Sequence, residues 1–140
     1  MTEQLIDAMQ SLTALMEEES DRLSRGGFVP EIGEIANAKI RLTGCIEAEL
    51  ARLKRQSPEW PETLDAEARQ VLSDASRELR DASTVNADIL ARKIELSSEM
   101  MAAIAAEAQR ISGSRSTVYG ASGGLGGMDI AAPISINARL

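Results

Sequence analysis

The residues of this chain that could take part in chemistry are few, and their types argue against catalysis. The sequence contains no histidine and a single cysteine, Cys45. It therefore lacks a Ser-His-Asp triad, a Cys-His dyad and the imidazole ligands common at zinc and iron sites. A lone thiol without a base is expected to be an inert, packed side chain, and it fits a reducing compartment. We predict that the protein is not an enzyme.

Carboxylates and glycines offer further candidate sites, but neither pattern is specific. Glu17, Glu18 and Glu19 fan around a helix and are expected to form a solvated face. Glu95 and Glu99 can share a face, but di-iron bundles pair their glutamates with histidines, which are absent here. The glycine cluster of residues 120–127 lacks the Gly-Lys-Ser/Thr ending of a phosphate loop. We therefore expect no metal and no cofactor.

Composition narrows the class of protein. The formal charge is −7, from 15 Lys and Arg against 22 Asp and Glu, and 44% of the residues are hydrophobic. The acidic balance disfavours nucleic acid as a partner, and the apolar content disfavours wholesale disorder. The longest apolar run, residues 100–106, is far shorter than the roughly 20 residues of a membrane span. No secretory signal pattern opens the chain. The expectation is a cytoplasmic protein that is not inserted in a membrane.

Apolar residues recur at three- and four-residue intervals in three stretches, which predicts an all-α fold. The predicted helices cover residues 3–25, 30–56 and 62–111, and Gly26-Gly27 and two prolines near residue 60 separate them. Because the first connection is short, we expect an antiparallel helical hairpin packed on a long third helix, as in a coiled-coil-like bundle. Residues 1–111 would form this bundle, and residues 112–140 a Gly-rich flexible tail.

The third predicted helix is longer than its companions can cover. It would extend roughly 75 Å, whereas the first two would each reach about 35–40 Å. The uncovered part must kink back, dimerise or bind a partner. Its apolar side chains, which we call the apolar stripe, are Leu90, Ile94, Leu96, Met100, Met101, Ile104 and Ile111. Taken singly, each member is expected to belong to an ordinary helix core, but the stripe as a whole favours a binding surface.

Three further side chains depart from their surroundings. Lys39 and Asn86 interrupt apolar seams, where a polar residue can set helix register or oligomeric state. For Lys39, an alternative is that its ammonium reaches the rim of the bundle. Tyr119, the only tyrosine, follows the third helix and either anchors a partner or packs locally on the helix end.

Together, the segments 12–23, 35–42, 86–90 and 117–123 resemble the FlgN family of flagellar export chaperones. The first two are similar to the family's Leu-x-x-Glu-x-x-x-Leu helix and its lysine-bearing second helix. Asn86-Ala-Asp-Ile-Leu90 resembles its Asn-x-x-Leu-Leu element, and Tyr119 lies in a Tyr-x-x-x-Gly ending. The order and spacing of these segments carry the resemblance, because each alone is a common helical pattern.

The resemblance implies a cytoplasmic chaperone of type III flagellar export. Its partners would be hook–filament junction proteins of the FlgK and FlgL type and an export-gate protein of the FlhA type. Leu90, Ile94, Met100, Met101, Ile104 and Ile111 would bind the substrate protein, and Tyr119 would dock on the gate. The alternative is a structural or adaptor coiled-coil protein that homodimerises through its third helix. A weak homodimer is compatible with either hypothesis.

Overall fold

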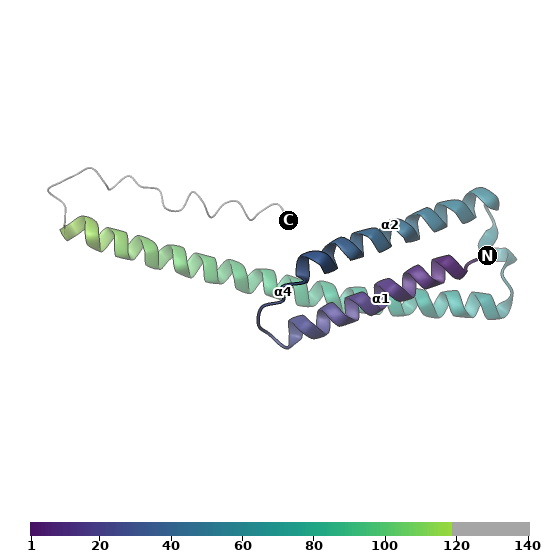
Figure 1. The fold of residues 1–140 in the computed structure, drawn as a ribbon, viewed down its shortest axis with the longest axis horizontal. Coiled ribbons are helices and arrows are strands. Elements are labelled where there is room, and N and C mark those ends of the chain that lie inside the picture. Colours follow the sequence, from purple (N-terminus) through teal and green to yellow (C-terminus); the bar gives the residue numbers. More distant parts are fainter. Residues whose placement is uncertain (119–140) are drawn as a thin grey trace. The chain divides into compact units, whose positions relative to one another are not determined.

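Four helices make up the part of the chain that this computed structural model describes, residues 1–118, with side chains described as far as Gly113. They are α1 (Glu3–Ser24), α2 (Ile32–Gln56), α3 (Trp60–Thr63) and α4 (Ala66–Val118) (Figure 1). Residues 1–118 contain no strand, so the predicted all-α fold is confirmed. The predicted tail beyond residue 118, including Tyr119, lies outside the described residues.

The chain divides into two compact units, Met1–Ala91 and Arg92–Leu140, and α4 contributes to both. Within the first unit, α1 and α2 form the expected antiparallel hairpin, and the first part of α4 runs antiparallel to α2 (Figure 1). The buried apolar side chains of this unit are Leu5, Leu12, Leu23, Ile35, Leu53, Ala75 and Ala82. Because α4 contributes only alanines to this set, its backbone can lie close to the hairpin.

The connection between α1 and α2 depends on two glycines. Gly26 and Gly27 have φ values of 77° and 85°, in the left-handed region that other residues rarely adopt. Arg22 donates to Glu18 at 2.7 Å and to Glu31 at 3.3 Å, so that one guanidinium joins the end of α1 to the start of α2. The helix begins at Ile32 rather than at the predicted residue 30. Pro30 lies in a turn, where Ile32 N–H bonds to the Val29 carbonyl at 3.3 Å.

The third predicted helix differs from the structure at both ends. The prolines leave a separate short helix, α3, and α4 begins at Ala66 because Asp65 caps it. One Asp65 side-chain oxygen accepts the Ala68 N–H at 2.7 Å. The predicted end at residue 111 is also too early, since α4 continues to Val118. A single glycine, Gly113, costs only about 1 kcal/mol in a helix and does not end it.

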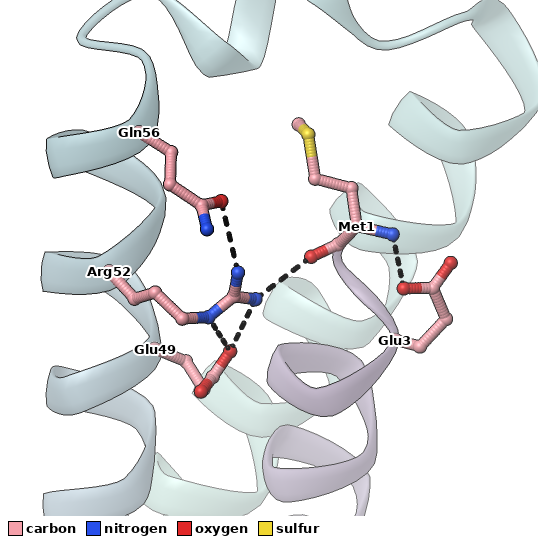
Figure 2. Close-up of polar contacts among 5 residues, drawn as sticks. All are labelled: Met1, Glu3, Glu49, Arg52 and Gln56. Atoms are coloured by element: carbon pink, nitrogen blue, oxygen red, sulfur yellow. Dashed lines mark hydrogen bonds and ion pairs between the residues drawn. The ribbon is translucent and has the colours of Figure 1, made fainter.

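Arg52 fastens the other end of the hairpin (Figure 2). Its guanidinium donates to Glu49 at 2.7 Å and 3.0 Å, to the Gln56 side chain at 3.0 Å and to the Met1 carbonyl at 3.1 Å. The hydrogen bonds to Glu49 raise the pKa of Arg52 above its ordinary value. Three of these four bonds stay within α2, and the fourth, to the Met1 carbonyl, connects α2 with the residues that precede α1.

Candidate functional site

The apolar stripe on α4 is exposed over most of its length. Leu90, the member that belongs to the first unit, is half-buried. Beyond Ala91 the exposed fractions are 66% for Ile94, 53% for Leu96, 65% for Met100, 39% for Met101, 62% for Ile104 and 41% for Ile111. Large apolar side chains scattered singly on a surface are ordinary, whereas a contiguous run of them makes a candidate interaction surface.

These side chains share one broad face of the helix. At 100° per residue, Ile94 and Met101 are separated by about 20°, and Met100, Ile104 and Ile111 follow beside them. Glu95, Glu99 and the other charged residues lie mostly on the opposite face. Leu96 and Ile94 mark the two limits of the stripe, which spans about 160° around the helix axis. This is wider than the narrow seam of a two-stranded coiled coil. Such breadth suits contact with more than one neighbouring segment.

An ion pair lies at one edge of the stripe. The Arg110 guanidinium donates to both carboxylate oxygens of Glu107, at 2.6 and 2.9 Å. These hydrogen bonds lower the pKa of Glu107 and raise that of Arg110. The pair keeps a negative and a positive charge together on the helix surface beside Ile104 and Ile111.

A buried polar network lies in the first unit, where α1, α2 and α4 meet. Lys39 of α2 donates from Nζ to Glu19 Oε1 of α1 at 2.6 Å and to Asn86 Oδ1 of α4 at 3.2 Å. Asn86 in turn donates from Nδ2 to the same Glu19 oxygen at 2.8 Å, to Ser20 Oγ at 3.1 Å and to the Met16 carbonyl at 3.4 Å. Each helix thus supplies one member of a closed triangle.

The three side chains of this triangle are largely buried, unlike those of a surface ion pair. Glu19 is 1% exposed and Asn86 3%, and the Lys39 side chain is 18% exposed. Throughout the described side chains, every buried polar atom has a hydrogen-bond partner. A charge pair away from water is tolerable only where its remaining hydrogen-bonding capacity is used, and Asn86 supplies both the donor and the acceptor that this requires.

The structure corrects the prediction for Glu19 and shows how Lys39 is paired. Glu17 and Glu18 are exposed as expected, but Glu19 is buried. Its position was a usable signal, because Glu19 follows Leu12 by seven residues and precedes Leu23 by four on the same face. Lys39 does not reach the rim alone. Its ammonium is partly buried and is paired with the Glu19 carboxylate.

The prediction for Cys45 was wrong. The thiol is exposed rather than packed. Leu42 and Ile46, its neighbours on α2, are half-buried, whereas Cys45 lies about 60–100° from them around the helix axis and faces solvent. A position at the edge of an apolar face cannot be assigned to the core from spacing alone.

Three carboxylates border a shallow groove between α1 and α4 in the first unit. Glu17, Glu78 and Asp81 lie around Ser20, Ala82 and Val85. Within residues 1–113 there is no group of three or more His, Cys, Asp or Glu side chains arranged to hold a metal ion. None of the helices in residues 1–118 has the length and apolarity needed to span a membrane.

Comparisons with protein-family models, with curated proteins and with solved structures give no match to this chain.

Proposed function

We propose that this chain is a cytoplasmic, non-enzymatic export chaperone of the FlgN type that needs no cofactor. It would hold hook–filament junction proteins of the FlgK and FlgL type unassembled and deliver them to an FlhA-type export gate. The observation that carries the proposal is the exposed apolar stripe on α4, from Ile94 to Ile111. A helix with one apolar and one charged face needs a covering segment, and a client's amphipathic helix is a segment of that kind.

The buried network gives the proposal a second support. Glu19, Lys39 and Asn86 come from three of the four segments that carry the resemblance to the FlgN family. In the structure these three side chains bond to one another. Three of the segments on which the resemblance was drawn therefore meet in one structural feature of this chain.

The chemistry of the stripe suits temporary holding. Its residues are aliphatic or methionine, and flexible methionine side chains adapt to more than one partner. A complex formed by apolar contacts, with no covalent step, can be released when the client is passed on. Full burial of one such side chain is worth roughly 1.5–3 kcal/mol, whereas association itself costs roughly 4–15 kcal/mol, so a stable complex has to cover most of the stripe.

The test is binding of the purified chain to the C-terminal segment of a hook–filament junction protein. Met101→Glu combined with Ile104→Glu should weaken this complex by about 100-fold or more, because two charges would have to be buried in the contact. The matched control is Ala102→Glu with Ala106→Glu, which adds the same charges to exposed positions on the opposite face of α4. The control should bind normally. Equal binding by all three proteins would reject the assignment of the stripe.

The alternative function is a structural adaptor that homodimerises through the same stripe. Light scattering of the free chain separates the two. A tight dimer that the Met101→Glu/Ile104→Glu variant dissolves, together with indifference to the junction segment, would favour the adaptor. A monomer, or a weak dimer that the junction segment dissociates, favours the chaperone.

Tyr119 is proposed as the gate-docking residue on the resemblance alone, since it lies outside the described residues. Tyr119→Ala should leave binding of the junction segment unchanged and weaken binding to the cytoplasmic domain of an FlhA-type protein. Loss of both activities, or of neither, would contradict this division of roles.

A further inference from the structure

We propose that Glu19, Lys39 and Asn86 form a register lock, by which the α1–α2 hairpin accepts its own α4 at one position only and excludes other apolar helices from that place. The lock concerns how the chain selects its own packing. The idea that the lock excludes client helices rests on the proposed function. The idea that it prevents α4 from packing in a shifted register does not.

The rest of the seam specifies register poorly. The small residues of α4 that face the hairpin are Ala68, Ala75 and Ala82, which repeat every seven residues. Ala75 and Ala82 are buried, and Ala68 is half-buried. A slip of α4 by seven residues, two helical turns, would place alanine on alanine and keep much of the apolar contact. Shape alone therefore leaves a competing register.

Asn86 removes this degeneracy. A shift by four or by seven residues would bring Ala82, Leu90, Leu79 or Lys93 beside the Glu19–Lys39 pair. Alanine and leucine offer neither donor nor acceptor, and lysine would add a second cation. Of these positions on the face of α4 that packs on the hairpin, only residue 86 carries a carboxamide. That group can donate to Glu19 and accept from Lys39 at once.

A foreign helix would leave the same two polar groups without a partner. An apolar helix seated in place of α4 would leave the Glu19 carboxylate without the 2.8 Å bond from Asn86 Nδ2 and Lys39 without its 3.2 Å acceptor. Glu19 is too deeply buried to recover that bond from water. One buried polar residue can determine register and partner choice in coiled coils for this reason. A protein that handles amphipathic helices would need such a device to keep its own bundle closed.

The experiment replaces the lock by apolar side chains in the full chain, as Glu19→Met, Lys39→Met and Asn86→Leu together. Two readouts are used: the number of species resolved by size exclusion with light scattering, and capture of a labelled peptide. The peptide spans residues 66–91 with Asn86→Leu. It therefore carries the face of α4 that packs on the hairpin but lacks the Asn86 carboxamide. We expect the triple variant to stay helical, to populate additional oligomers and to bind the peptide at least about tenfold more tightly than the unmodified chain does.

Two control variants separate selection from stability. Exchanging the charges, Glu19→Lys with Lys39→Glu, preserves a lock because the Asn86 amide can rotate, so this variant should behave as one species and exclude the peptide. Ile35→Val weakens the apolar core without touching the network, and it should also give one species.

Neither readout uses a junction protein. The test of the lock therefore gives the same result whether or not the chain proves to be an export chaperone. A triple variant that forms one species and excludes the peptide like the unmodified chain would overturn the lock. So would a triple variant that unfolds, because the network would then supply stability rather than selection. Additional species in the Ile35→Val control would show that the readout follows stability alone, and this too would overturn the inference.

Discussion

At residue 86 a buried carboxamide meets the buried carboxylate of Glu19 and the partly buried ammonium of Lys39. Asparagine fits because its oxygen accepts from Lys39 while its nitrogen donates to Glu19 and Ser20. No charged side chain could serve both neighbours, and no apolar one could serve either. The energetic consequence is asymmetric, since a complete network is close to neutral but an incomplete one is costly.

We therefore predict that Asn86→Ala lowers the free energy of unfolding by about 1–3 kcal/mol, because the buried Glu19 loses a hydrogen bond that water cannot replace. Urea denaturation followed by circular dichroism measures the change. The matched control is Asn37→Ala on α2, an exposed position where the substitution should be nearly silent. A loss of similar size in both variants would contradict the argument.

Lys39→Met should be the more damaging substitution in the same assay. It leaves a buried carboxylate without its cation, and the expected loss is about 3 kcal/mol. Arg25 offers a matched control, because its ion pair with Asp21 is exposed and Arg25→Met should change stability little. If Lys39→Met proved as mild as Arg25→Met, then the ion pair of Lys39 would carry no more weight than a surface pair.

At the level of the helices, the glycines divide by conformation. Gly27 has a φ of 85°, and Gly27→Ala should destabilise the protein by about 1–2 kcal/mol because an L-residue is strained there. Gly44 lies inside α2, and apart from its chain neighbours and the adjacent backbone of its own helix no atom lies within 4 Å of a Cβ added to it. Gly44→Ala should stabilise by about 0.5–1 kcal/mol, since alanine is the better helix former. Melting temperatures of the two variants should therefore move in opposite directions.

The ion pair between Glu107 and Arg110 makes part of the stability of α4 depend on pH. Because the pKa of Glu107 is lower in the helix than its ordinary value of about 4.3, the pair contributes stability above that value. This contribution is lost as the pH falls through the lowered pKa. Arg110→Gln should return the pKa of Glu107 to its ordinary value, as read from its carboxyl resonance by NMR. Arg92→Gln, on the same helix and outside this pair, should leave the Glu107 titration unchanged.

For the whole molecule, the two units should differ in how readily their backbone opens. Residues 72–90 belong to the bundle with the buried core, whereas the side chains of residues 94–104 are mostly exposed. Helical amides in a segment whose side chains are mostly exposed open more easily, so those of residues 94–111 should exchange with deuterium roughly tenfold faster or more. Adding the junction segment should slow exchange in residues 94–111 and leave residues 72–90 unchanged. Uniform exchange along α4 in the free chain would contradict this difference.

Much of this architecture follows from sequence periodicity. The spacing of Leu5, Leu12 and Leu23, the Gly26-Gly27 break and the repeat after it were enough to predict a hairpin and a longer third helix. The apolar stripe was predicted in the same way, and its residues beyond Ala91 are indeed exposed. The limits of α4 were missed because its start depends on one cap, Asp65, and its end on no strong breaker.

Local pattern therefore determined where this chain is helical and which face of each helix is apolar, because both properties depend on neighbours within a few turns. Only the tertiary structure decided that Glu19 is buried while Cys45 is exposed. Periodicity places a residue relative to its own helix axis, and it contains no information about which helix lies opposite. Lys39 and Asn86 are 47 positions apart in the sequence. The reason for a polar residue at each position is visible only in the folded chain, where α1, α2 and α4 bring both side chains to the Glu19 carboxylate.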